Sequence, residues 1–237
     1  MKVIGHRGAA GLAPENTFAG FDLALEIGVD GIETDVQKTK DGQLVLFHDD
    51  LLDRTTNGTG VLQEKSWQEL QQLDAGLWFD DKYAGQRIPL LLEAMKRYGT
   101  RTYFDLEVKQ IGIEDEVLSM VEHLKLLDRV TFTSQDFSTV RTMRENNPLA
   151  RVGYITADFS EEMITRVIKA KIQVFCPRAE KITSRLVNQW HSSGLFVRAC
   201  GVKTTEIMKN AIHAGVDGMT SDFPNLLLKE LGRSGRA

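Results

Sequence analysis

The sequence predicts an α/β protein, a TIM-type (β/α)8 barrel with a small inserted cap after the second strand. Short apolar runs rich in β-branched residues alternate with longer amphipathic stretches along the whole chain, a pattern typical of parallel β-α units. Eight such runs can be counted in 237 residues, which matches the size of a β/α barrel. We therefore expect a single domain over residues 1–237.

The predicted strands share a short length and a central apolar segment. They cover residues 3–6, 31–35, 102–107, 130–133, 151–155, 173–176, 196–199 and 218–221. Amphipathic periodicity predicts helices between them, for example over 15–27, 113–126 and 204–214. Pro14 is suited to the first turn of the first of these helices, where its missing N–H is tolerated.

The segment after the second strand departs from simple alternation. Residues 36–49 are typical of a hairpin, with Asp41 and Gly42 as its turn and 44–47 as the returning strand. From about residue 50 to 87 the chain is polar and turn-rich around a short helical patch. We interpret this segment as an insertion rather than a second domain. A long excursion from the carboxyl end of a barrel strand would lie over the active-site mouth.

Composition and charge point to a globular protein with a small-molecule partner. Hydrophobic residues make up 42% and charged residues 26% of the chain, and the formal net charge is -4 without a basic block. This pattern gives no footprint for nucleic acid or an anionic membrane surface. Without a signal-like segment or an apolar run of about 18 residues, we expect a cytoplasmic protein with no stable membrane association. Cys176 and Cys200 have no metal or redox spacing and are expected to be buried thiols.

Polar residues concentrate at the carboxyl ends of the early strands, where barrel enzymes carry their catalytic groups. They are His6 and Arg7 after the first strand, Glu33 and Asp35 on the second, His48 and Asp49 after the hairpin, and Asp105, Glu107 and Lys109 on the third. Because the carboxyl ends of all barrel strands face one mouth, these side chains are expected to converge there.

Three of these acids predict a divalent metal site. Glu33 and Asp35 are two positions apart on one strand, so their side chains project from the same face. Glu107 would join them from the neighbouring strand. Any one acid could simply pair with Arg7 or Lys109. Three carboxylates together would repel one another without a cation, whereas magnesium or calcium prefers such oxygen ligands.

The two histidines predict acid-base chemistry beside this metal site. Imidazole titrates near neutral pH, so one histidine of His6 and His48 can act as base and the other as acid. Arg7 and Lys109 can hold phosphate oxygens and offset charge in the transition state. A strand-end hydrogen bond for His6 and a hairpin cap for His48 are the alternatives. The joint occurrence of two histidines, two cations and a metal site favours phosphodiester cleavage.

An ordered set of motifs resembles the glycerophosphodiester phosphodiesterases, in particular the short bacterial cytoplasmic type. The first motifs are His6-Arg7-Gly8, Pro14-Glu15-Asn16-Thr17, Glu33-Thr34-Asp35-Val36, Thr39-Lys40-Asp41-Gly42 and His48-Asp49. The later ones are Arg54-Thr55-Thr56-Asn57-Gly58, Leu73-Asp74-Ala75-Gly76, Ile88-Pro89 with Glu93, Glu107-Val108-Lys109, Gly215-Val216-Asp217-Gly218 and Ser221-Asp222-Phe223-Pro224. Order and spacing agree over almost the whole chain.

The resemblance implies a barrel with one divalent ion that hydrolyses glycerophosphodiesters, such as glycerophosphocholine and glycerophosphoethanolamine. The products would be sn-glycerol 3-phosphate and an alcohol. Carried over to this sequence, the resemblance implies metal ligation by Glu33, Asp35 and Glu107, and acid-base catalysis by His6 and His48.

The resemblance also implies phosphate contacts from Arg7 and Lys109, with Asn16 as a supporting polar residue. One departure lies near the seventh predicted strand. The family often has Val-x-Ala-Trp there, and this chain has Val197-Arg198-Ala199-Cys200. Loss of the aromatic wall is expected to loosen or reshape the alcohol side of the pocket, so it affects substrate preference rather than the metal or the histidines.

The sequence leaves several alternatives open. A lysophospholipase D-type phosphodiesterase of the same fold would need an apolar groove, and a non-catalytic glycerophosphodiester-binding protein would not need the full set of catalytic residues. Attack by water and attack by the glycerol hydroxyl, which gives a cyclic phosphate, fit the same groups. Apolar residues at 226–228 would suit either a homodimer contact or ordinary helix packing.

Overall fold

The computed structural model describes residues 1–233 and shows a closed barrel of eight parallel strands. The strands are β1 (Lys2–Gly5), β2 (Gly31–Lys38), β4 (Tyr103–Val108), β5 (Val130–Ser134), β6 (Arg151–Thr156), β7 (Val174–Pro177), β8 (Phe196–Ala199) and β9 (Gly218–Ser221). Their order is β1-β9-β8-β7-β6-β5-β4-β2, and pairing of β1 with β2 closes the ring. The barrel predicted from the sequence is confirmed.

The hairpin predicted after the second strand is also present. β3 (Leu44–Leu46) pairs antiparallel with the end of β2, with Val36 opposite Leu46. The turn contains Gly42 at φ 86°, a left-handed conformation that glycine adopts without steric cost. β2 runs to Lys38, three residues beyond its predicted end, because its last residues pair with β3 rather than with a barrel strand alone.

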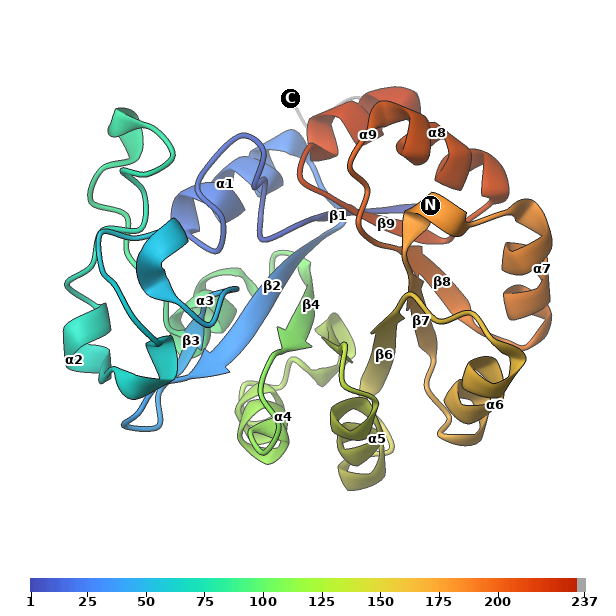
Figure 1. The fold of residues 1–237 in the computed structure, drawn as a ribbon, viewed down its shortest axis with the longest axis horizontal. Helices are drawn as coiled ribbons and strands as arrows, with labels where there is room; N and C mark the ends of the chain where they lie inside the picture. Colours follow the sequence, from blue (N-terminus) through green and yellow to red (C-terminus); the bar gives the residue numbers. More distant parts are fainter. Residues whose placement is uncertain (234–237) are drawn as a thin grey trace.

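Helices flank the barrel strands on the outside (Figure 1). They are α1 (Phe18–Ile27), α3 (Leu91–Tyr98), α4 (Glu114–His123), α5 (Phe137–Asn146), α6 (Glu161–Lys169), α7 (Ser184–Ser192), α8 (Thr205–Ala214) and α9 (Pro224–Glu230). The described part has no helix that combines the length and apolarity required to cross a bilayer.

The prediction that Pro14 lies in the first turn of α1 is wrong. The helix begins at Phe18, and its N-cap is Thr17, whose hydroxyl accepts a hydrogen bond from the Gly20 amide at 3.2 Å. Asn16 has φ 52°, which a right-handed helix does not allow. The residues before Thr17 form an irregular loop that leads from β1 to the barrel mouth.

The main core lies between the barrel strands and the surrounding helices. Phe21 of α1 and Phe104 of β4 are fully or almost fully buried and meet edge to face at 6.3 Å. Phe132 and Phe175 have no exposed surface, as expected for aromatic strand residues that pack inside. Burial of each such ring stabilises the fold by about 1.5–3 kcal/mol.

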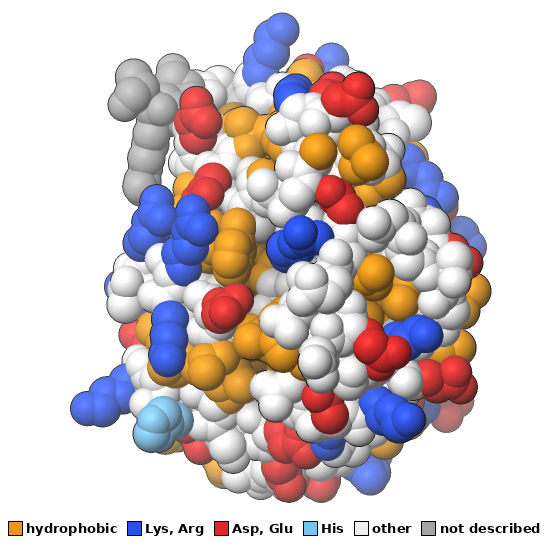
Figure 2. All heavy atoms as spheres, turned by 90° about the vertical axis from the view of Figure 1, so that its left-hand side faces the viewer, with side chains coloured by type: hydrophobic (Ala, Val, Ile, Leu, Met, Phe, Trp, Pro, Cys, Tyr) orange, Lys and Arg blue, Asp and Glu red, His pale blue; other side chains and the backbone are white. Residues whose placement is uncertain are grey.

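The chain between β3 and α3 forms a cap with its own small core. Its short elements are η1 (Leu52–Arg54), η2 (Leu62–Glu64), α2 (Trp67–Leu70) and η3 (Asp81–Tyr83). Its core consists of Val45, Phe47, Leu52, Leu62, Leu70, Ala75 and Ile88. Figure 2 shows the face of the molecule that lies on the left in Figure 1, where hydrophobic and charged side chains are interspersed over the surface. The single-domain organisation over the full chain stays a prediction, since its last four residues lie outside the described part.

Candidate active site at the barrel mouth

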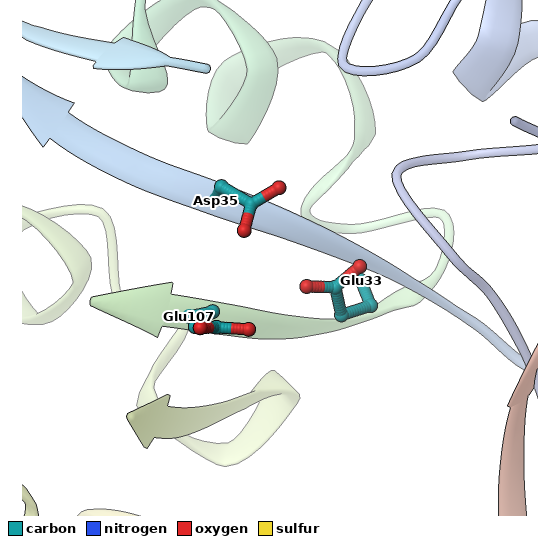
Figure 3. Close-up of side chains that lie close together, drawn as sticks. All are labelled: Glu33, Asp35 and Glu107. Carbon is teal, nitrogen blue, oxygen red and sulfur yellow. The ribbon is translucent and has the colours of Figure 1, made fainter. Parts of the chain in front are cut away.

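Three carboxylates from two neighbouring strands form the centre of the site. Glu33 and Asp35 project from β2 and Glu107 from β4, and the three side chains point toward one another (Figure 3). Strand register places Asp35 directly opposite Glu107. One oxygen of each lies within 4.8 Å of the other two, and all three residues are buried. The sequence-predicted acidic cluster is therefore brought together.

The electrostatics of these acids are unfavourable without a cation. Burial, and after it the negative charge of Asp35, raises the pKa of Glu33 to about 7. Burial also opposes ionisation of Asp35, but the positive charges of Arg7, His48 and Lys109 hold its pKa below the usual range. Asp35 Oδ1 is buried and has no hydrogen-bond partner in the described part of the chain. An acceptor of this kind suits a hard cation.

His6 follows β1 and is held by a residue from the other end of the chain. Its Nδ1 lies 2.5 Å from Oδ1 of Asp222, which follows β9, and its Nε2 lies 3.8 Å from Glu33 Oε2. Because an ionised carboxylate only accepts, Nδ1 carries the hydrogen and Nε2 is left for chemistry. Burial lowers the pKa of His6, but Glu33 and Asp222 outweigh this and the net pKa is raised.

His48 follows β3 and is held by its own neighbour. Its Nδ1 lies 2.5 Å from Asp49 Oδ1. Arg54, from η1 of the cap, donates to the same carboxylate from Nε at 2.6 Å and from Nη2 at 2.9 Å. Hydrogen bonds from Arg54 hold the pKa of Asp49 well below its usual range. The cap thus contributes directly to the orientation of His48.

A second carboxylate, Glu15, joins Arg54 to Arg7. Glu15 accepts from Arg7 Nη1 at 2.8 Å and from Arg54 Nη1 at 2.8 Å and Nη2 at 2.7 Å. Burial raises the pKa of Glu15, but the two guanidinium groups lower it by more than burial raises it. The net pKa of Glu15 is therefore below its usual value. Arg7 and His48 are therefore positioned by one ion-pair network.

Arg7 adopts a backbone conformation that directs its own amide to the acids. Its φ is 49°, and its N–H donates to Glu33 Oε2 at 2.9 Å. The next residue, Gly8, has φ 91°, and a Cβ there would lie 2.6 Å from the carbonyl carbon of Gly20 in α1. Glycine is required because the loop crosses the helix backbone at this point. Arg7 Nε lies 3.3 Å from Asp35 Oδ2 but is too poorly aligned for a hydrogen bond.

Lys109 and Asn16 complete the set of predicted residues. Lys109 Nζ lies 3.3 Å from Glu107 Oε1 and 3.7 Å from Asp35 Oδ1. Asn16 is buried, donates from Nδ2 to Asp35 Oδ2 at 2.9 Å and accepts from Thr34 at 2.7 Å. Asn16 therefore fixes the orientation of Asp35.

One candidate from the sequence lies elsewhere, and several supporting residues were not anticipated. Asp105 was expected at the mouth, but it pairs with buried Arg198 inside the barrel at 2.9 Å. Register places Asp105 beside Glu33, two residues before Glu107, and the shorter aspartate side chain binds Arg198 instead of joining the acidic cluster. Asp49 was expected at the mouth without a role, and it orients His48. The supporting residues that were not expected there are Glu15, Arg54, Asp222 and Gln135, which donates to Glu107 at 3.0 Å. The role of Asp49 could have been found from its position next to His48, and Asp222 from its position directly after a barrel strand.

A β/α barrel with carboxylates, two histidines and two cations gathered at its mouth is typical of an enzyme. Comparison with known proteins gives the family. Residues 6–226 match the glycerophosphoryl diester phosphodiesterase family, and the chain belongs to this family.

Relatives and solved structures agree with this assignment. The chain is 34% identical to a glycerophosphodiester phosphodiesterase of Caldanaerobacter subterraneus subsp. tengcongensis, with 98% of each chain covered. A phosphodiesterase from Oleispira antarctica, solved in complex with the product sn-glycerol-3-phosphate, is similar with a TM-score of 0.88 and 29% identity over 98% of this chain and 97% of that chain. A glycerophosphodiester phosphodiesterase from Agrobacterium tumefaciens has a TM-score of 0.87 and 29% identity, covering 97% of this chain and 99% of that chain.

Proposed function

We propose that this protein hydrolyses glycerophosphodiesters to sn-glycerol 3-phosphate and an alcohol, with a divalent cation and with His6 and His48 as the acid-base pair. The observation that carries the proposal is the cluster of Glu33, Asp35 and Glu107, buried at the mouth with oxygens within 4.8 Å of one another. Family membership and the product complex of the Oleispira antarctica relative support the substrate class.

The donor set fits magnesium or calcium. All three proposed ligands, Glu33, Asp35 and Glu107, offer carboxylate oxygens, which these hard cations prefer over nitrogen or sulfur. The raised pKa of Glu33 indicates that Arg7 and Lys109 do not fully neutralise the cluster. Asp35 Oδ1 accepts no hydrogen bond from residues 1–233 and could take a cation as a further partner. When bound, the cation would supply positive charge that binds phosphate oxygens and offsets negative charge developing in the transition state.

Arg7 and Lys109 are proposed to bind the phosphate from the two sides of the acidic cluster. Each already contacts a carboxylate of the cluster, Arg7 at Asp35 and Lys109 at Glu107. Each also keeps donor capacity, since a guanidinium has five N–H groups and an ammonium has three. Asn16 would support the site by holding Asp35.

His6 and His48 are proposed to move the protons. One takes the proton of the attacking oxygen as this oxygen bonds to phosphorus, and the other protonates the alkoxide as its bond to phosphorus breaks. Both Nδ1 atoms contact carboxylates at 2.5 Å, which leaves both Nε2 atoms for these transfers. The order of the two histidines stays open. A substrate analogue without the glycerol hydroxyl distinguishes attack by water from attack by that hydroxyl. The analogue is cleaved if water attacks and is not cleaved if the hydroxyl is required.

The alcohol side of the pocket is proposed to differ from that of relatives with tryptophan after β8. Cys200 is half-buried, and its Sγ donates to the Cys176 carbonyl at 3.5 Å. A thiol covers far less surface than an indole. We expect Cys200→Trp to change the ratio of kcat/KM values for glycerophosphocholine and glycerophosphoethanolamine, with little change in cation dependence.

We further propose a cytoplasmic location, which the two free cysteines support. Immunodetection in cell fractions tests it. In the segment suggested for a homodimer, Leu227 and Leu228 are buried and Leu226 is 38% exposed, which favours helix packing. Sedimentation of the purified protein measures the oligomeric state.

The central experiment measures release of sn-glycerol 3-phosphate from glycerophosphocholine and glycerophosphoethanolamine with a coupled dehydrogenase. We expect activity with magnesium or calcium, none after chelation, and loss in both His6→Ala and Glu33→Ala. Activity that survives chelation would contradict the metal assignment. Release of lysophosphatidic acid from lysophosphatidylcholine, without turnover of either water-soluble substrate, would favour the lysophospholipase D alternative. Substrate binding without turnover would favour a binding protein.

A further inference from the structure

A cavity lies at the amino-terminal end of the barrel, opposite the mouth. Its volume is about 270 Å³, and each of the eight barrel strands contributes its first residue to the lining. Ile4, Val130 and Val174 form apolar walls. For comparison, an apolar cavity of about 150 Å³ holds a benzene ring. The cavity at this end is large enough for a small organic molecule.

Three cations at this cavity have no carboxylate partner among the residues that the structure describes. Lys2 and Arg129 lie over the ring of Tyr103, at 5.8 and 5.7 Å from its centre, and Arg151 lies over Phe196 at 4.8 Å. All five residues line the cavity. Among residues 1–233 none of the three cations forms an ion pair, whereas other charges of the lining do. The cation–π contacts restrain these side chains only weakly and leave their charges available.

The acids of the lining do not neutralise these cations. Both oxygens of Asp30 are bound by Arg233, at 2.8 and 3.1 Å. Asp105 is bound by Arg198 at 2.9 Å. Asp128 is the remaining acid of the lining. Three unpaired cations therefore face one unpaired carboxylate, and the cavity carries excess positive charge that a dianion would match.

One nitrogen of a buried arginine in the same lining has no hydrogen-bond partner within residues 1–233. Arg198 is 3% exposed, and its Nη atoms bind Asp105, Thr220 and Cys176. Its Nε has no hydrogen bond within the described part of the chain. A buried donor left unpaired costs about 1–3 kcal/mol. This nitrogen has almost no accessible surface, so Arg198 adds positive charge beside the cavity rather than a contact for a ligand.

We propose that this cavity is a second ligand site, for a small organic phosphate monoester with an apolar or aromatic body. The body would lie between Ile4, Val130 and Val174, and the phosphate would be bound at the rim by Arg129 and Arg151. Guanidinium groups suit this role because their planar donors match phosphate oxygens. The site is separate from the mouth and does not depend on the proposed hydrolysis.

Calorimetric titration with phenyl phosphate tests the proposal. Phenyl phosphate combines one aromatic ring with a phosphate dianion, and inorganic phosphate and phenol serve as controls for each part. Arg129→Gln combined with Arg151→Gln removes the charge, and we expect at least about a tenfold loss of affinity. Gly218→Leu instead fills the cavity and leaves the cations in place. A Cβ at Gly218 would lie 3.6 Å from its nearest neighbours, an ordinary contact, so we expect binding to be lost without unfolding.

Two further variants distinguish binding in this cavity from binding at other arginines and from binding at the mouth. Arg166→Gln removes a guanidinium that also stacks on an aromatic ring, Phe137 at 4.5 Å, but lies outside the cavity, so affinity should stay within about twofold. Arg7→Ala removes a phosphate-binding group at the mouth, so binding to the cavity should persist. Thermal unfolding and phosphodiesterase activity of the cavity variants report on folding.

Three results would overturn the proposal. The first is the absence of binding to the wild-type protein at about millimolar phenyl phosphate. The second is binding that disappears in Arg7→Ala but survives in a folded Gly218→Leu protein, which would place the ligand at the mouth. The third is inorganic phosphate binding as tightly as phenyl phosphate, which would show that the apolar body makes no contact.

Discussion

The two ends of the barrel carry charge in opposite ways. At the mouth, acids are in excess, and almost every charged group is tied to another, from His48 through Asp49 and Arg54 to Glu15. At the amino-terminal end, cations are in excess, and three of them lie over aromatic rings with no carboxylate partner in the described part of the chain. The same eight strands support both arrangements.

Both ends carry charged groups, so the proposed catalytic end is distinguished by the hydrogen bonds and ion pairs that link its charged groups to one another. Groups that transfer protons must be held in one orientation, and short hydrogen bonds to carboxylates do this for both histidines. Cations that only attract a ligand need less restraint. Substitutions at the two ends should therefore have very different effects on turnover.

The largest contrast is expected between His48 and the cations of the opposite end. His48→Ala should lower kcat by about 10²- to 10⁴-fold because a positioned proton-transfer group is lost. The double substitution Arg129→Gln with Arg151→Gln should change kcat by less than about twofold. Release of sn-glycerol 3-phosphate measures both. Similar losses of kcat in the two variants would contradict the assignment of proton transfer to the mouth alone.

Between the two ends, the buried Asp105–Arg198 pair should control stability. Both residues are buried, and the pair is joined at 2.9 Å. Asp105→Ala leaves an uncompensated guanidinium, so the free energy of unfolding should fall by about 3–5 kcal/mol. Urea unfolding measures it. Asp105→Leu with Arg198→Met removes both charges and should recover most of the loss, and a loss below about 1 kcal/mol in the single variant would argue against this role.

The carboxylates behind the histidines should have intermediate effects on turnover. Asp222→Asn and Asp49→Asn should each lower kcat by about 10- to 100-fold. KM should change little, because the imidazoles lose their orientation while the substrate keeps its contacts. Steady-state kinetics on glycerophosphocholine check this. Arg54→Lys should affect turnover less than Asp49→Asn, since it weakens the clamp on Asp49 but keeps the carboxylate. A rise in KM with unchanged kcat would point to substrate binding instead.

The smallest effect is expected for the Asp30–Arg233 pair. Burial raises the pKa of Asp30, but hydrogen bonds from Arg233 and the Val3 amide outweigh it, so the folded-state pKa is lowered. The resulting stability is present above the ordinary aspartate pKa of about 3.9 and is lost as pH falls through the folded pKa.

Arg233→Gln tests this sign directly. Because Arg233 is partly exposed, the loss at neutral pH should not exceed about 1 kcal/mol. The difference from the wild-type protein should shrink as acid protonates Asp30, and unfolding curves over a pH series measure it. A difference that grows toward low pH would have the wrong sign for this pair.

The barrel could be predicted because its signals are local. Each strand shows an apolar run of its own, and Asp41-Gly42 identifies the hairpin turn by the conformation that glycine allows. The acidic cluster followed from two rules of strand geometry, alternation within β2 and neighbouring carboxyl ends. Pro14 was misplaced because a helix start depends on the backbone of Asn16, which the residue types before Thr17 do not reveal.

The supporting network could not be predicted because its contacts join distant segments. Arg54 was visible only as part of a motif, and its contact with Glu15 across 39 residues depends on how the cap folds back. Asp105 was placed at the mouth because alternation fixes the face of a strand but not the partner that a side chain binds. The cavity at the amino-terminal end depends on strand tilt and side-chain size around the whole ring, which no single segment encodes.

The hydrogen bond between His6 and Asp222 has a consequence for synthesis of the protein. Its partners are 216 residues apart, so the first strand to leave the ribosome carries a proposed catalytic group whose carboxylate is among the last residues made. Chains interrupted before β9 would lack both the strand that pairs with β1 and the residue that orients His6. Incomplete copies of this protein would therefore be inactive, and turnover would begin only once the ring has closed.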